Sequence, residues 1–203
     1  MSKIKDNSGV LIQGHIKIHD PESDKVFVDK RNAIHYENMS VALAESIANQ
    51  GQGFINSMSF GNGGTSVDPT GIITYLTPNS TGTNATLYNQ TYTKIVDDRS
   101  VSNLDPQRNK IETRHINGTN YTDVIVTCLL DYGEPNGQDA VDTASASESL
   151  YVFDELGLVS YSPSGTGKLL THVIFHPVQK SLNRLIQIDY TVRVQSLTGF
   201  NEG

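Results

Sequence analysis

The amino-acid sequence predicts a mainly β protein, an antiparallel β-sandwich with one short flanking α-helix and long polar loops. Charged residues make up only 18% of the 203 residues, while 17 residues are Gly, and soluble domains usually carry roughly 25% charged residues. Several short segments alternate apolar and polar residues, which is the period of a half-buried strand. Hydrophobic residues reach 36%, enough for one core, so we expect a single β-rich domain over residues 1–203.

The N-terminal part of the chain predicts a β-hairpin over about residues 9–30, as an elaboration of that domain. Its first strand places apolar side chains on one parity and polar side chains on the other. The apolar set is Val10, Ile12, Ile16 and Ile18. Residues 20–24 hold Asp, Pro and Ser, which favour a turn, because Pro fixes φ and the polar side chains bond nearby backbone.

A second elaboration is a helix predicted over about residues 38–49. Asn38 or Ser40 can cap its start, and Gly51 stands where a left-handed residue often ends a helix. Its apolar face is expected to hold three residues at four-residue spacing, Met39, Leu43 and Ile47. We interpret it as a helix packed against the flank of a sheet.

Most of the remaining chain alternates between strand patterns and polar segments. The clearest strands are expected at residues 124–130, 150–153 and 186–195. Long polar loops are expected at residues 77–89 and 133–149, which nearly lack large apolar side chains. Loops of this length order well against a neighbouring molecule, since polar segments can fold on binding.

Charge and length patterns exclude several partners. The formal net charge is -7 and no segment is rich in Lys or Arg, so we expect no nucleic-acid partner. No stretch approaches the roughly 20 apolar residues of a membrane span, and the N-terminus lacks the apolar run of a secretion signal. A single cysteine, Cys128, forbids an intrachain disulfide, which fits folding in a reducing cytoplasm.

Motifs for cofactors are incomplete in this sequence. Residues 164–168 resemble part of a phosphate-binding loop, but Ser162 replaces its first Gly and Leu169 replaces the hydroxyl residue that binds Mg²⁺. Two pairs of histidines stand four residues apart, His15 with His19 and His172 with His176. On a strand that spacing separates the side chains by about 13 Å, too far for one metal. We therefore expect neither a cofactor nor a metal.

Catalytic constellations are equally incomplete, so we expect that the chain is not an enzyme. The sequence lacks a Gly-x-Ser-x-Gly elbow, and Cys128 lies in an apolar strand, where a thiol is inert. Asp154 and Glu155 are adjacent. Neighbouring side chains on a strand point to opposite faces, so these two carboxylates are not expected to form a pair.

The residues of interest are therefore structural or interface candidates. Gly61, Gly63 and Gly64 follow Phe60 at the end of a short strand, and Gly157 lies in a later strand. We expect these four glycines to hold backbone conformations that a β-carbon penalises. For Glu155 two alternatives stay open: a buried or interface carboxylate that accepts backbone hydrogen bonds, or a solvated edge residue.

Residues 60–65 (FGNGGT) and 153–158 (FDELGL), separated by a long loop, resemble segments of virion structural proteins of tailed bacteriophages. The resemblance is to collar or neck, baseplate and fibre-attachment proteins of contractile-tailed phages. Residues 14–18 and 28–35 also resemble the start of such proteins. The chain departs from a fibre shaft because it has no coiled-coil or collagen-like region.

The resemblance implies a virion protein that folds in the host cytoplasm and then assembles as a repeated subunit in the tail, neck, collar or baseplate region. Its partners would be copies of itself, as a homo-oligomer in a ring or symmetric assembly, and other virion proteins such as fibres. We expect the N-terminal ribbon and residues 61–98 to make the intersubunit contacts. Two alternatives are a capsid-decorating protein and a host-glycan-binding β-sandwich module, for which the 9 Tyr residues leave room despite the absence of Trp.

Overall fold

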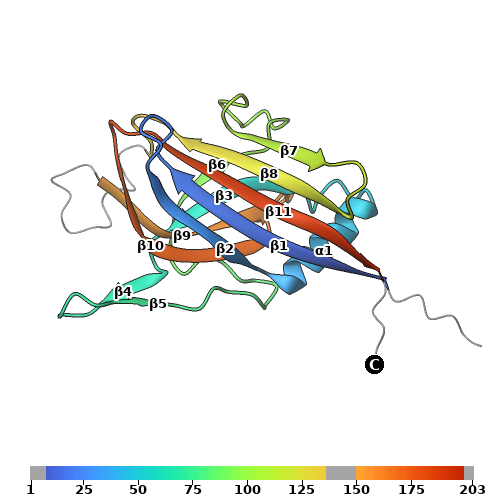
Figure 1. Ribbon diagram of the computed structural model, residues 1–203, viewed down its shortest axis with the longest axis horizontal. Coiled ribbons are helices and arrows are strands. Elements are labelled where there is room, and N and C mark those ends of the chain that lie inside the picture. Colours follow the sequence, from blue (N-terminus) through green and yellow to red (C-terminus); the bar gives the residue numbers. More distant parts are fainter. Residues whose placement is uncertain (1–7, 136–149, 199–203) are drawn as a thin grey trace, which may run out of the picture.

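A computed structural model describes residues 8–135 and 150–198 of the chain (Figure 1). Nine of its strands form one antiparallel sheet in the order β6-β3-β9-β10-β2-β1-β11-β8-β7, so the predicted mainly β architecture is confirmed. The nine strands are β1 (Ser8–His19), β2 (Val26–Ile34), β3 (Ile55–Gly61), β6 (Gln90–Ile95), β7 (Lys110–His115), β8 (Tyr121–Leu130), β9 (Leu150–Ser160), β10 (Thr171–Ser181) and β11 (Ile186–Thr198). Most of the polar loop expected at 133–149 lies outside the described residues.

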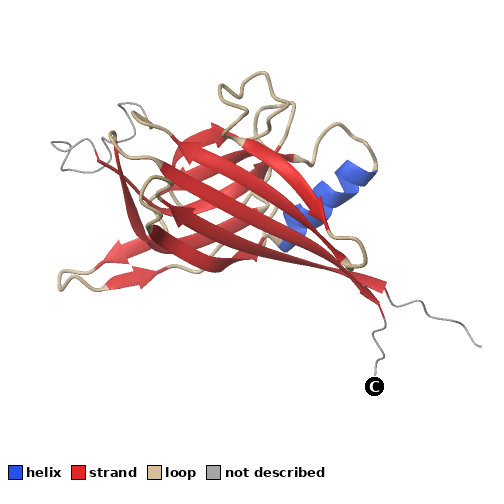
Figure 2. Ribbon diagram, turned by 45° about the horizontal axis from the view of Figure 1, so that its top comes forward, coloured by secondary structure: helices blue, strands red, loops and turns tan. Residues whose placement is uncertain are grey.

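The large sheet curls, so that β3, β6 and β9 lie across the core from β1, β11 and β8 in a sandwich-like arrangement (strands labelled in Figure 1, curl visible in Figure 2). Inward side chains from both halves fill the space between them. Ile16 and Tyr190 come from one half, Phe60 and Leu158 from the other, and all four are fully buried. Burial of such side chains contributes about 1.5–3 kcal/mol each, and this explains why the alternating segments form strands.

The N-terminal hairpin forms as expected, but it lies inside the sheet. β1 pairs with β11 along its whole length, from Ser8↔Thr198 to His19↔Gln187, and with β2 from Gly14 to His19. The alternation places Ile16 and Ile18 in the core. The hairpin is therefore part of the central sheet, because its apolar side chains need the covering strands.

The single helix of the described residues, α1 (Tyr36–Ile47), starts earlier than the sequence indicates. His35 caps it, because His35 Nδ1 accepts a hydrogen bond from the Asn38 backbone N–H at 3.2 Å, so the expected caps Asn38 and Ser40 are wrong. Only its first turns cover the sheet: Met39 and Ala42 are buried, whereas Ile47 is 86% exposed. The helix ends before Gly51: Ala48 is its C-cap and Asn49 follows with the left-handed backbone. The expectation that Gly51 ends the helix is therefore wrong, although Gly51 is itself left-handed farther on, with φ +69.

A second, two-stranded sheet projects from the body at the lower left of Figure 1. It consists of β4 (Thr65–Val67) and β5 (Ile73–Tyr75). We refer to residues 65–76 as the arm. Its tip is closed by Asp68, whose carboxylate accepts the backbone N–H groups of Thr70 at 2.8 Å and Ile72 at 3.0 Å.

Candidate functional site

The predicted site residues meet where the arm leaves the sheet. β3 and β9 are neighbouring antiparallel strands, with the register Phe60↔Leu156 and Gly61↔Glu155. Phe60 points into the core and packs edge-to-face on Phe153, with ring centroids 5.4 Å apart. The two short motifs that carry the sequence resemblance therefore lie side by side at the base of the arm.

β9 reverses the direction of its side chains between Phe153 and Leu156. Both of these residues belong to the core, although a regular strand sends residues three apart to opposite faces. The β9–β10 register also shifts between Ile174 and Val178. Asp154 and Glu155 consequently both point away from the core, toward the same loops, and the expectation that they face opposite sides is wrong, because an irregularity of this kind re-aims side chains.

Glu155 is fully buried and accepts hydrogen bonds with both carboxylate oxygens. Its Oε1 accepts the backbone N–H of Gly63 at 3.1 Å and that of Asn89 at 2.8 Å. Its Oε2 accepts the backbone N–H of Tyr88 at 3.0 Å and lies 2.9 Å from Nε2 of His172. Of the two alternatives for Glu155, the buried carboxylate that accepts backbone bonds is confirmed.

His172 extends this arrangement to a further segment. Its Nδ1 accepts the backbone N–H of Asn79 at 2.8 Å, so that nitrogen carries no proton in this contact. The proton of a neutral imidazole then lies on Nε2, which donates to Glu155. The imidazole is buried and connects residue 79 of the long loop to β9.

Asp154, 3% exposed, holds the first residues of the arm. Oδ1 accepts the backbone N–H of Gly64 at 2.8 Å, and Oδ2 accepts that of Thr65 at 2.9 Å as well as the Thr65 hydroxyl. We call Asp154, Glu155 and His172 the carboxylate anchor. Together they hold residues 63–65 and residues 79–89 against the sheet.

The two adjacent carboxyls have pKa values shifted in opposite directions. Burial raises the pKa of Asp154, and its hydrogen bonds from Thr65 and Gly64 offset only part of that effect. Burial also acts to raise the pKa of Glu155, but the hydrogen bond from His172 and three backbone N–H groups outweigh it and lower the pKa. Glu155 is therefore the carboxylate that the site stabilises as an anion.

A lack of space for a β-carbon, and not a left-handed backbone, explains why the four predicted positions are glycine. Gly61, Gly63, Gly64 and Gly157 all lie outside the left-handed region. A β-carbon on Gly61 would lie 2.4 Å from the backbone oxygen of Asn89, and one on Gly157 would lie 2.3 Å from that of Thr171. These positions need glycine because the neighbouring chain leaves no room for a side chain.

The anchor is suited to holding chain segments in place. Each carboxylate oxygen already has donors from the protein itself, and saturated buried networks of this kind stiffen a structure. Sequence reasoning missed the roles of Asp154 and His172. A usable signal was present: apolar residues at 151, 153, 156 and 158 change parity around the two acidic residues, which indicates an irregular strand.

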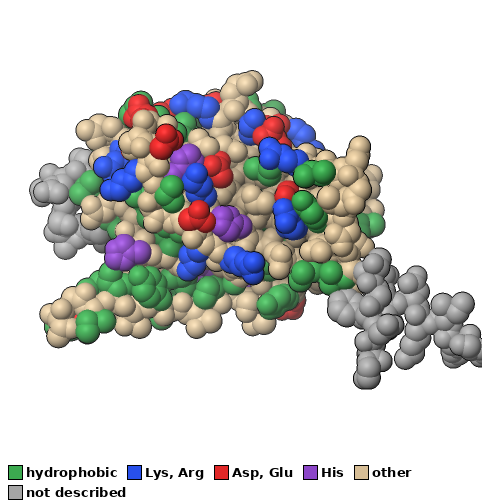
Figure 3. All heavy atoms as spheres, in the orientation of Figure 1, with side chains coloured by type: hydrophobic (Ala, Val, Ile, Leu, Met, Phe, Trp, Pro, Cys, Tyr) green, Lys and Arg blue, Asp and Glu red, His purple; other side chains and the backbone are tan. Residues whose placement is uncertain are grey.

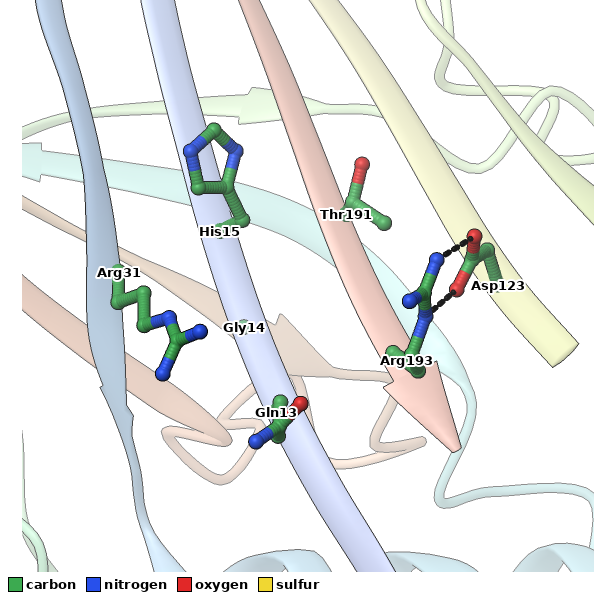
Figure 4. A pocket seen from close by; sticks show the side chains of 7 residues that line it. All are labelled: Gln13, Gly14, His15, Arg31, Asp123, Thr191 and Arg193. Atoms are coloured by element: carbon green, nitrogen blue, oxygen red, sulfur yellow. Dashed lines mark hydrogen bonds and ion pairs between the residues drawn. The ribbon is translucent and has the colours of Figure 1, made fainter. Parts of the chain in front are cut away.

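The outer face of the sheet contains a shallow depression of about 380 Å³ (Figure 4). It is lined by Gln13, Gly14, His15, Arg31, Asp123, Thr191 and Arg193. Arg193 donates to both oxygens of Asp123, at 2.7 and 2.9 Å, and its guanidinium lies 3.9 Å from the ring centroid of Tyr121. His15 lies 2.8 Å from a carboxylate oxygen of Asp29. Asp123, Arg193 and His15 are thus partnered within the protein.

Comparisons with protein-family models, curated proteins and solved structures found no match to this chain. Within residues 8–135 and 150–198, no group of three or more His, Cys, Asp or Glu side chains is placed to hold a metal ion. No helix in the same residues is long and apolar enough to cross a membrane.

Proposed function

We propose that the chain is a structural subunit of a tailed-phage virion, repeated in the tail, neck, collar or baseplate region, where it docks other virion proteins such as fibres. The sequence resemblance suggests the class of particle. The structural observation that carries the interaction role is the arm, which projects from the body (Figure 1) and whose apolar side chains are exposed.

The arm is too small to be stable through its own contacts. Two-stranded ribbons are marginal in water, and its large apolar side chains remain exposed. Their exposed fractions are 62% for Val67, 63% for Ile72, 50% for Tyr75 and 42% for Leu76. Burial against a neighbouring subunit would contribute part of the roughly 1.5–3 kcal/mol that full burial of such a side chain yields. Assembly therefore offers the stabilisation that the isolated arm lacks.

The anchor complements this role, because it fixes the direction in which the arm leaves the body. Asp154 binds the first two residues after the bend, Gly64 and Thr65, and the backbone N–H of Leu76 returns to the oxygen of Gly64 at 2.9 Å. An arm fixed at its base loses less conformational freedom on docking than a flexible loop does.

We also propose that the chain acts without catalysis. The buried carboxylates and histidine at the site hold their own backbone, and Cys128 is buried with a pKa raised by burial to about 12, which disfavours a thiolate nucleophile.

Mass spectrometry of gradient-purified particles, followed by cryo-electron microscopy of the same sample, tests the proposal. We expect the chain in the particles, in symmetric copies within the tail, neck or baseplate. Density on the capsid shell would instead support the decorating alternative. Absence from particles, combined with glycan binding by the purified protein, would overturn the virion proposal in favour of a glycan-binding module.

A further inference from the structure

We propose that the arm of one copy pairs with an unpaired edge of β1 in the next copy, head to tail. The inference rests on the proposed role as a repeated subunit and identifies the two surfaces that meet. The unpaired edge comprises residues 8–13, which we call the β1 edge. These residues pair with β11 on one side, whereas β2 pairs with β1 only from Gly14 onward.

The β1 edge is open because β2 leaves β1 for another strand. Beyond Asn32, β2 turns to β10, with the register Ala33↔His172 and Ile34↔Thr171. In the described part of the chain, no other strand replaces β2 beside residues 8–13. A strand edge of this kind presents unpaired N–H and C=O groups that can bind another strand.

Side-chain chemistry distinguishes this edge from the two ends of the sheet. Residues 8–13 carry no charge, and Val10 and Leu11 are 63% and 37% exposed. At one end of the sheet, β7 carries a series of charged or titratable residues, Lys110, Glu112, Arg114 and His115, and such residues block edge pairing.

The strand at the other end of the sheet, β6, contacts β8 in the opposite half of the curled sheet. Lys94 of β6 donates through its ammonium group to the backbone oxygen of Leu129 in β8, at 2.7 Å, so this edge faces the far side of the curled sheet. Compared with the two end strands β6 and β7, the β1 edge is therefore the one that carries no charged side chain.

The arm matches the β1 edge in chemistry, and the edge has room for the whole of β5. Its single charged residue is Asp68, whose carboxylate is occupied at the tip, so strand β5 and its flanks present an uncharged apolar edge. Figure 3 shows hydrophobic side chains along the arm at the lower left. Strand β5 has three residues, Ile73–Tyr75, and the six residues of the β1 edge span roughly 20 Å, so the β1 edge is long enough to pair with the whole of β5. Main-chain pairing would supply affinity and the apolar side chains would supply specificity.

The positions of the two surfaces favour contact between different copies. The arm lies at one end of the long axis of the molecule and the β1 edge at the other (Figures 1 and 2). The arm therefore docks on the next subunit instead of its own. A contact between two different surfaces is heterologous, and repeating it produces a ring or a filament.

Disulfide trapping tests this pairing with little background, because Cys128 is the only cysteine and is fully buried. Thr74→Cys on β5 and Leu11→Cys on the β1 edge are purified separately, mixed at high protein concentration and oxidised. We expect a cross-linked dimer in the mixture, a ladder of oligomers from the double variant, and no cross-link from either variant alone. Cross-linking of Leu11→Cys alone would indicate two-fold edge pairing, and no cross-link in the mixture would indicate no pairing; either result overturns the inference.

A charge on the β1 edge provides the second measurement. Val10→Lys should abolish oligomers in light scattering without changing Tm, because Val10 is exposed. Thr113→Lys on the already charged β7 is the matched control and should leave assembly unchanged. If Val10→Lys assembles into particles like the wild type, the inference fails while the virion proposal stands. If the cross-link forms but the chain is absent from particles, the virion proposal fails and the head-to-tail contact stands.

Discussion

The base of the arm and its outer part have opposite chemistry, although they are adjacent in the sequence. At the base, two carboxylates and an imidazole are buried and saturated by hydrogen bonds. Farther out, Ile72 and Tyr75 expose most or half of their apolar surface. A soluble domain usually buries apolar groups and exposes charged ones. The reversal suggests that the base fixes the arm and that a partner covers the rest.

The largest effect is expected from Glu155→Gln at the base. The new amide NH₂ would face the N–H groups of Tyr88 and His172, or those of Gly63 and Asn89, which donate to the two oxygens today. His172 cannot correct this by changing its tautomer, because its Nδ1 accepts from Asn79. Each buried donor left unsatisfied costs about 1–3 kcal/mol, so we expect a loss of about 2–6 kcal/mol and a fall in Tm on the order of 10 °C.

Differential scanning calorimetry measures this loss, with Glu112→Gln as the matched control. Glu112 lies on β7 with 54% of its side chain exposed, beside Lys110, and exposed pairs contribute little. Equal Tm values for Glu155→Gln and Glu112→Gln would contradict the stabilising role of the anchor.

Substitution of one glycine at the base and one near the tip compares how tightly the two parts are packed. At the base, a β-carbon on Gly63 would lie 2.7 Å from the backbone nitrogen of Asn89, whereas Gly71 near the tip has open space but a φ of +85. Gly63→Ala should therefore cost about 1–3 kcal/mol by overpacking, and Gly71→Ala about 1 kcal/mol by backbone strain. Urea unfolding of both variants gives the order, and a larger loss at Gly71 would show that the base is less tightly packed than described. Gly63→Val should cost more than Gly63→Ala.

The sequence predicted the β class because strand alternation is a local property, as in residues 186–195, which form part of β11. It also placed Phe60, Gly61, Gly63, Gly64, Glu155 and Gly157 among the residues of interest, and the structure brings them together. The facing of Asp154 was missed, although the parity change of the apolar residues at 151, 153, 156 and 158 indicated an irregular strand, because the register shift between β9 and β10 is seen only in the folded sheet. Nor could the sequence place His172 beside residue 79, because that contact joins distant parts of the chain.

The pH dependence of stability separates the two anchor carboxyls. The lowered pKa of Glu155 means that its contribution is present above the unfolded value of about 4.3 and is lost as pH falls through the folded pKa. The raised pKa of Asp154 acts in the opposite sense: its contribution is present below the unfolded value of about 3.9 and is lost as pH rises through the folded pKa. Urea midpoints between about pH 2.5 and 7 measure both effects. We expect the difference between wild type and Glu155→Gln to shrink as the pH falls, and a constant difference would rule out an ionised Glu155 in the anchor.

The smallest effect on the isolated subunit is expected from Ile72→Ser on the arm. Ile72 is 63% exposed, and substitutions at such sites change stability by about 0.5 kcal/mol or less. The same change should strongly reduce assembly, because it removes apolar surface that the proposed contact buries. Val101→Ser is the matched control, since Val101 is fully exposed and belongs to the loop between β6 and β7, not to the arm. Light scattering measures assembly and calorimetry measures stability. If Ile72→Ser lowers Tm as much as Glu155→Gln does, the arm is stabilised within its own subunit, and the contrast between base and outer part fails.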